Sequence, residues 1–195
     1  MGLSIHYSGR FNRSASLQEL VEEVVEISKV YHWEHSVYEV NFPEGVFKTR
    51  YNGEIYGVTF TPPGCETVIL TFLSNGRMSS IAHLKFYGNS SDKDNQKYLY
   101  MLSTKTEFAG MKTHMLIIHL LKYISKKYLQ NFRLIDEGKY WETGDEKLLE
   151  DTFKRYNDLL NSFTDALETF PVNTGETMED YLLRLFDRVN KKRRM

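Results

Sequence analysis

The chain has 195 residues, of which 25 are lysine or arginine and 26 are aspartate or glutamate, so its formal net charge is −1. A chain of this length removes about 70% of its extended surface from water on folding, so it requires neither a metal nor a disulfide to stabilise a core. The near-zero charge argues against a protein built to neutralise nucleic-acid phosphates, and a hydrophobic content of 41% excludes a disordered chain.

The sequence carries no mark of secretion or of membrane insertion. Its longest uncharged runs, 55–65 and 67–76, are about half the roughly 20 apolar residues that a membrane-spanning helix requires. The first residues lack the basic and apolar regions of a signal peptide. The single cysteine, Cys65, excludes an internal disulfide. We therefore expect a cytoplasmic protein that does not contact a membrane.

The N-terminal part predicts a strand followed by a helix. Leu3, Ile5 and Tyr7 alternate with polar residues, as in a strand that buries one face. Ser16 and Glu19 form a capping box, which marks the start of a helix. The apolar residues that follow recur every three or four positions and predict an amphipathic helix.

From about residue 37 to residue 106 the apolar period changes to two, which is typical of strands. Five strands are expected, around residues 38–42, 56–60, 68–72, 84–86 and 98–102. Turn sequences separate them, including Asn52-Gly53 and Asn75-Gly76, dipeptides that tolerate the positive φ angles of tight hairpins. This segment therefore predicts an antiparallel meander.

Helical periodicity returns in the last part of the chain. The expected elements are a deeply packed helix over 111–129, a short β element over 132–142, a helix capped at Thr143 and a last helix capped at Thr177. This order predicts the α+β class, with an antiparallel β-meander sheet packed against helices and a helical C-terminal part. We expect one domain over 1–195, with 145–195 as its helical extension.

Among the six histidines, His114 is the strongest candidate for chemistry. On a helical wheel it falls among apolar positions, whereas His119 falls on a lysine-rich polar stripe, so the two point about 140° apart and cannot chelate one metal. The expected role of His114 is that of a core histidine bonded to a neighbour, and a catalytic role is the alternative. The histidines do not stand at metal-ligand spacing, so we expect neither a metal nor a cofactor.

Five acidic residues gather in the segment 136–146, whose sequence is Asp-Glu-Gly-Lys-Tyr-Trp-Glu-Thr-Gly-Asp-Glu. Clustered carboxylates can hold Mg²⁺ or Ca²⁺, or raise one another's pKa for acid–base catalysis. The spacing matches no calcium-loop pattern, however, and a helix start accounts for Asp145 and Glu146. We expect that this segment shapes the backbone rather than performs a reaction.

Two segments resemble an uncharacterised family of bacterial proteins: Lys-Thr-Glu-Phe-Ala-Gly at 105–110 and the acidic stretch at 136–145, with the His114 helix between them. The resemblance begins at Ile5–Gly9 and extends to about residue 160. It implies a bacterial, cytosolic protein. Because the family has no assigned activity, the resemblance assigns no catalytic residue.

Two hypotheses of function remain open. The first is a non-catalytic protein that acts through a protein partner, as an immunity-like or inhibitor-like protein, because no complete catalytic constellation and no cofactor motif is present. The alternative is a metal-dependent or acid–base hydrolase that uses the segment 136–146. The candidate catalytic residues are His114, Asp136, Glu137, Glu142 and Lys105, and the candidate binding residues are Tyr140 and Trp141.

The oligomeric state also stays open. The apolar stripes of the last two predicted helices can pack on the sheet, on each other, or across a two-fold axis of a homo-oligomer. The sequence does not choose among these arrangements.

Overall fold

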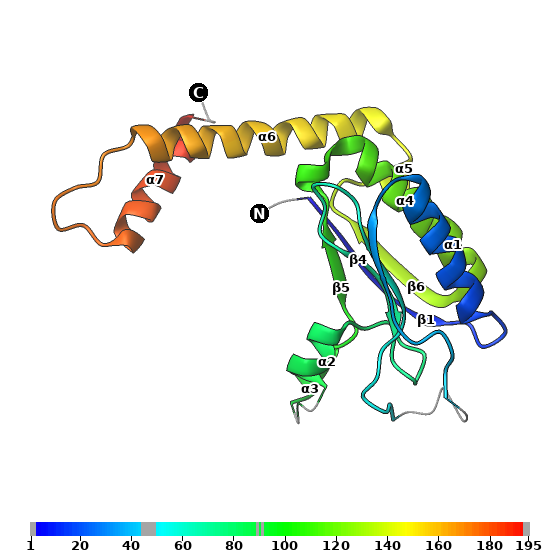
Figure 1. The fold of residues 1–195 in the computed structure, drawn as a ribbon. Coiled ribbons are helices and arrows are strands. Elements are labelled where there is room, and N and C mark those ends of the chain that lie inside the picture. The colour runs from blue at the N-terminus through cyan, green and yellow to red at the C-terminus, as the bar shows by residue number, and fades with distance from the viewer. Residues whose placement is uncertain (1–2, 44–49, 89, 91, 193–195) are drawn as a thin grey trace. The chain divides into compact units, whose positions relative to one another are not determined.

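A computed structural model describes residues 3–43, 50–88, 90 and 92–192 of the chain. The chain divides into two compact units, Met1–Leu149 and Glu150–Met195, which we call the N-terminal and C-terminal units. Helices and two small antiparallel sheets confirm the predicted α+β class (Figure 1). In chain order the elements are β1 Ser4–Phe11, α1 Leu17–Val30, β2 Glu34–Val37, β3 Tyr56–Thr61, β4 Val68–Phe72, α2 Ile81–Tyr87, α3 Lys93–Tyr98, β5 Leu102–Lys105, the 3₁₀ turn η1 Glu107–Ala109, α4 Gly110–Tyr128, β6 Leu129–Asp136, α5 Tyr140–Thr143, α6 Glu146–Thr169 and α7 Met178–Lys192.

Both sheets of the N-terminal unit are antiparallel. The first has the order β5-β1-β6, with Ile5 opposite Thr104 on one side and opposite Asp136 on the other. The second has the order β2-β3-β4 and is a meander. The Ile69 N–H donates to the Tyr7 hydroxyl at 2.8 Å, so a side chain of the first sheet ties it to the second.

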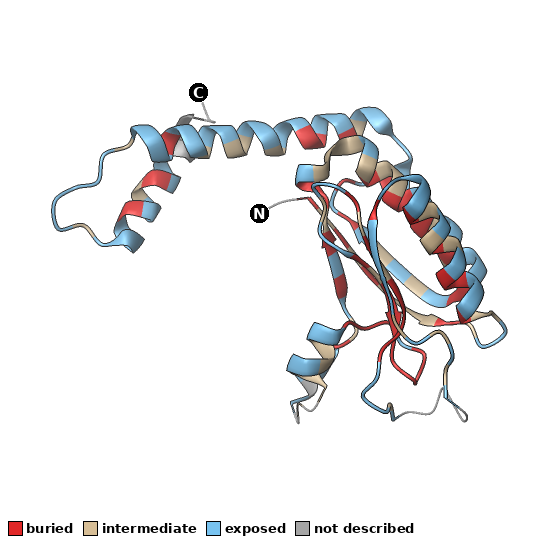
Figure 2. Cartoon of the chain, in the orientation of Figure 1, coloured by how far each residue is buried: buried red, intermediate tan, exposed pale blue. Residues whose placement is uncertain are grey.

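Helices α1 and α4 lie side by side against the sheets, α1 over β3 and α4 over β6 (Figure 1). Strand alternation buries Val58, Phe60 and Leu70 completely. Buried residues gather along the strands and on parts of the helices of this unit (Figure 2). The rings of Phe11 and Phe72 meet edge to face at 5.2 Å, a favourable aromatic geometry that closes one end of this core.

The expected strand at 84–86 is wrong, because this segment is helix α2. The Ser80 side chain caps the helix by accepting the His83 N–H at 3.0 Å. Leu84 and Tyr87 pack together against the buried cluster of Ile55, Leu73 and Leu99, which residues three apart can do only on a helix. Phe86, counted as a core residue of the strand, is instead exposed.

Three other expected elements also differ from the structure. The strand predicted at 38–42 forms earlier, at Glu34–Val37, and the strand predicted from 98 begins only at Leu102, because Tyr98 ends helix α3. Residues 140–143 form helix α5 rather than a strand, since Lys139 adopts a left-handed φ of 63° that turns the chain. The residues 44–49 of the predicted meander lie outside the described part of the chain.

Sequence signals at helix starts and turns account for several local features. The Ser16 cap of α1 and the Thr177 cap of α7 are confirmed. Asp145, not Thr143, caps α6, because its carboxylate accepts the Leu148 N–H at 3.0 Å. The predicted turn at Asn75-Gly76 is present, with Gly76 at a φ of 77°.

None of the helices in the described part of the chain combines the length and the apolar character that crossing a bilayer demands.

Candidate functional site

His114 and Asp136, two of the predicted catalytic residues, lie in contact at the centre of the N-terminal unit. His114 Nε2 is 3.1 Å from Asp136 Oδ1, and neither side chain has any exposed surface. On the other side of the ring, His114 Nδ1 is 2.8 Å from the Thr106 hydroxyl, which donates to the Leu3 carbonyl. This arrangement confirms the prediction of a core histidine bonded to its neighbours.

The Asp136 carboxylate is held by two backbone donors and by its contact with the His114 ring. It accepts the backbone N–H groups of Gly138 at 2.7 Å and Trp141 at 2.9 Å, in addition to its contact with His114. Burial alone would raise the pKa of Asp136, but the hydrogen bond and charge of His114 and the two backbone N–H groups hold it below its usual value. The carboxylate therefore stays ionised and fixes the turn that leads into α5.

Gly138 completes this buried cluster, because a larger residue would crowd three side chains of the cluster and its surroundings. A Cβ atom at this position would lie 2.6 Å from Leu149 Cδ1 and 3.1 Å from both Asp136 Oδ1 and His114 Nε2. The backbone thus covers the His114–Asp136 pair directly, and Thr106, His114, Asp136 and Gly138 form a sealed polar cluster.

The other candidate residues do not converge on this cluster. Glu137 accepts the Ser4 N–H and lies 3.5 Å from His6, Lys105 pairs with Glu107 at 3.2 Å, and Glu142 is exposed. Tyr140 is buried and its hydroxyl is 3.2 Å from His119 Nε2. Lys122 lies over the rings of both Tyr140 and Trp141, at 5.7 and 5.5 Å.

Of the five candidate catalytic residues, then, the structure brings His114 and Asp136 together and leaves Lys105, Glu137 and Glu142 apart. A solvent-borne substrate cannot touch the pair in this conformation, because both side chains are fully buried. The five candidate residues therefore do not meet at one open site in the described part of the chain.

Cys65 is not an activated nucleophile. Burial, with a smaller effect of Glu66, raises the pKa of the Cys65 thiol to about 12, so the reactive thiolate is scarce at neutral pH. The sulfur lies 3.3 Å from the Lys105 carbonyl oxygen, to which the thiol donates.

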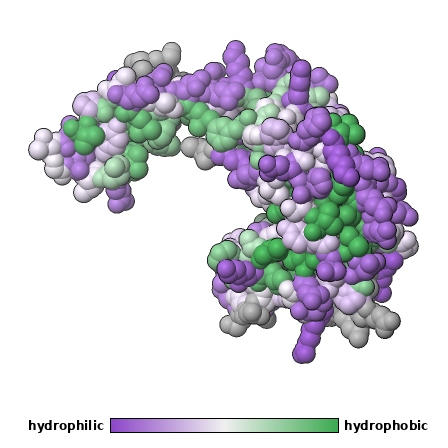
Figure 3. Space-filling view, in the orientation of Figure 1, coloured by the Kyte–Doolittle hydropathy of each residue, from purple (hydrophilic) through white to green (hydrophobic). Residues whose placement is uncertain are grey.

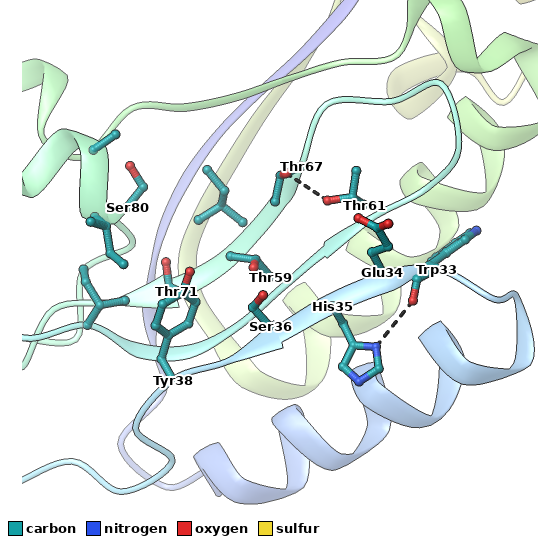
Figure 4. Close-up of a pocket in the computed structure, with 14 residues that line it drawn as sticks. Trp33, Glu34, His35, Ser36, Tyr38, Thr59, Thr61, Thr67, Thr71 and Ser80 are labelled. Carbon is teal, nitrogen blue, oxygen red and sulfur yellow. Dashed lines mark hydrogen bonds between the residues drawn. The ribbon is translucent and has the colours of Figure 1, made fainter.

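An open hollow of about 710 Å³ lies on the outer face of the sheet β2-β3-β4 (Figure 4). Because successive strand residues alternate in direction, Val58 and Phe60 enter the core while Thr59 and Thr61 point into the hollow. Ser36 lies directly opposite Thr59 on the neighbouring strand. Seven hydroxyl groups line the hollow, from Ser36, Tyr38, Thr59, Thr61, Thr67, Thr71 and Ser80.

The hollow is rich in hydroxyl groups and poor in charge. Among its described lining residues, Glu34 and His35 are the two with an acidic or basic side chain. Thr61 and Thr67 bond to each other at 2.9 Å, and Thr71 donates to the Ser79 carbonyl. This lining can exchange neutral hydrogen bonds with a bound molecule, but it does not place a nucleophile beside a base.

Strand β2 forms one rim of the hollow and is an edge of its sheet. Its four residues are all exposed, and among the described strands it pairs with β3 alone. The Tyr38 N–H donates to the Gly57 carbonyl of the next strand, so by strand alternation the N–H of Val37 points away from β3. An edge of this kind can pair with an added strand.

Sequence reasoning missed this site. The alternation that identified the buried faces of 56–60 and 68–72 also defines the opposite face, and a run of threonines on that face was the available signal. The sequence could not show that Ser80 and Ile81 lie at its end, since it predicted a strand at 84–86 in place of helix α2.

Within the described ranges, no three histidine, cysteine or acidic side chains are placed to hold a metal ion together. No protein-family model, no curated protein and no solved structure matches the chain.

Proposed function

We propose that this chain is a non-catalytic protein of the bacterial cytoplasm that acts through a protein partner, in the manner of an immunity protein or an inhibitor. The observation that carries the proposal is the hydroxyl-lined hollow beside the edge strand β2. Backbone groups at the edge and neutral side chains beside it together suit an extended segment of another protein.

The chemistry of the hollow supports a peptide rather than a charged ligand. A peptide backbone offers N–H and C=O groups at the spacing of a strand, and the outward backbone groups of β2 are their natural partners. Ser36 and Thr59 stand beside that edge with hydroxyl groups that both donate and accept. The scarcity of charged residues argues against recognition of phosphate or of nucleic acid.

The structural roles of His114, Asp136 and Cys65 support a protein without catalytic activity. His114 and Asp136 contact each other inside the sealed polar cluster, and the raised pKa of the Cys65 thiol keeps it protonated at neutral pH. A chain without a reaction of its own changes a partner by occupying one of its surfaces, and this is how an inhibitor works.

The test compares two serine-to-arginine variants. Ser36→Arg places a long cation at the rim of the hollow, whereas Ser103→Arg places the same side chain at an exposed position of β5 in the other sheet. The tagged wild-type chain and both variants are used to capture proteins from an extract of the source organism. We expect one stoichiometric partner with the wild type and Ser103→Arg, and loss of at least tenfold in affinity with Ser36→Arg.

The captured partner is then purified and its own activity is measured with and without this chain. Inhibition by the wild type and by Ser103→Arg, but not by Ser36→Arg, supports the proposal. A partner that binds all three proteins equally would place its site elsewhere, and the proposal for the hollow would be wrong.

A further inference from the structure

The C-terminal unit is a helical hairpin of α6 and α7 with a very small interior. Its buried core consists of Ala166, Tyr181 and Leu185, against which Leu159, Phe163 and Phe170 pack with part of their surface. Chains below about 40 residues rarely stabilise a fold with their own core, and this 46-residue unit is close to that size. Burial of further apolar surface against another molecule would therefore stabilise the hairpin.

Several apolar residues of the hairpin remain exposed. On α7, Met178, Leu182 and Phe186 follow one another at intervals of four and share one face of the helix. They are 73%, 42% and 47% exposed, and Leu167 of α6 is 41% exposed. Apolar side chains gather along both helices in Figure 3. We call Leu167, Met178, Leu182 and Phe186 the apolar stripe.

Polar contacts fix the rotation of α7 about its axis, so Met178, Leu182 and Phe186 cannot turn into the core of the hairpin. The Tyr181 hydroxyl donates to the carbonyl of Phe170 at 3.2 Å. Arg184 makes a two-point ion pair with Glu176, and its guanidinium lies 4.1 Å from the centre of the Phe170 ring. These contacts hold Tyr181 and Leu185 in the core of the hairpin, and they leave the apolar stripe outside that core.

We propose that the apolar stripe is the interface with a second copy of this chain, so that two hairpins form a four-helix bundle around a two-fold axis. All four members of the stripe are more than two-fifths exposed, so a second copy has apolar surface on both helices of the hairpin to cover. A two-fold axis buries the same patch twice, so each hairpin supplies the missing layer of the other.

The composition of the stripe favours a second copy over a partner of opposite charge. None of its four members is charged, and the residues beside it include both signs, with Glu179 and Asp187 acidic and Arg188 basic. A patch without a dominant charge neither attracts a charged partner nor repels its own copy. This inference is independent of the partner surface proposed above, which lies on the N-terminal unit.

The first experiment measures the mass of the full chain in solution by sedimentation equilibrium from 1 to 200 µM. We expect a dimer for the wild type and a monomer for Leu182→Glu/Phe186→Glu, because the charges would be buried at the interface. The control is Asn161→Glu, which adds a charge at an exposed position of α6 about 100° or more from its apolar face. It should leave the dimer unchanged, and circular dichroism should show equal helix content in all three proteins.

The second experiment does not depend on disruptive variants. In a Cys65→Ser background, Leu182→Cys should form an intermolecular disulfide on mild oxidation, whereas Asn161→Cys should not. A wild-type chain that is monomeric up to 200 µM overturns the proposal, and so does a dimer that survives Leu182→Glu/Phe186→Glu without the Leu182→Cys cross-link.

Discussion

The carboxylate of Asp136 links three segments of the N-terminal unit: helix α4 through His114, the turn at Gly138 and the start of α5 at Trp141. All three contacts are made by a charged group without access to water. Breaking a buried pair of this kind by changing one partner leaves an uncompensated polar group, which is among the costlier single changes in a protein.

Asp136→Asn should therefore reduce the free energy of unfolding by about 3 kcal/mol at pH 7. Because the folded pKa of Asp136 lies below the unfolded value of about 3.9, its contribution is present above that pH and is lost as the pH falls through the folded pKa. The difference between wild type and variant should shrink below about pH 4.

The measurement is urea unfolding from pH 7 to pH 3, followed by the fluorescence of Trp33 and Trp141, which both lie in the N-terminal unit. Glu142→Gln is the matched control, since Glu142 is an exposed acid of the same segment. If Asp136→Asn and Glu142→Gln lost the same free energy of unfolding, the buried contacts of Asp136 would stabilise the fold no more than an exposed acid does.

Gly138→Ala should destabilise the chain by about 1–3 kcal/mol, because its new methyl group would overlap Leu149 and press on Asp136 and His114. Leu149→Val removes the overlapping Cδ1 atom. In a double-mutant cycle of the two changes, the combined loss should be smaller than the sum of the single losses. Strict additivity would show that the two side chains do not meet.

At the scale of elements, the edge strand β2 is the feature with the clearest consequence. If a partner adds a strand there, the outward N–H of Val37 is one of its donors. Proline removes that donor, and edge strands tolerate it far better than central strands do.

Val37→Pro should abolish capture of the partner while lowering the melting temperature by only a few degrees. Val37→Thr keeps both the N–H and the branched shape of the side chain, so it should bind as the wild type does. Binding is measured by titration of the purified partner. If Val37→Thr also failed to bind, the side chain rather than the backbone edge would be the contact.

Sequence patterns predicted the elements whose signals are local. The alternation of Leu3, Ile5 and Tyr7 and the caps Ser16 and Thr177 all appear in the structure. The predictions from sequence patterns were wrong where contacts with distant segments determine the type of secondary structure. Leu84 with Phe86 fits a strand by period two, yet the cluster of Ile55, Leu73 and Leu99 selects Leu84 and Tyr87 on a helix.

The candidate site was harder to predict for the same reason. The sequence identified His114 and Asp136 as unusual residues, but their separation of 22 positions gives no sign that both are sealed from water. The hollow depends on strand pairing, on which face α1 covers and on the fold of α2. Those are properties of distant segments, so local periodicity cannot report them.

At the scale of the whole molecule, the two proposed surfaces belong to different units. A variant that disrupts one interaction should therefore leave the other intact. Ser36→Arg should lose the partner and remain a dimer, whereas Leu182→Glu/Phe186→Glu should become a monomer and retain the partner with its affinity changed less than threefold. Sedimentation and partner titration on the same four proteins, with the wild type and Ser103→Arg included, give the answer. Joint loss in either variant would mean that the surfaces are coupled.

The position of β1 has a consequence for synthesis. It is the central strand of β5-β1-β6, although it is synthesised before both of the strands that pair with it. One neighbouring strand begins at residue 102 and the other at residue 129, so the nascent strand stays unpaired on both sides until β5 is synthesised and on one side until β6 is. Such distant pairings fold slowly. A stalled chain that ends before β6 should therefore remain protease-sensitive, with its first strand still unpaired on one side.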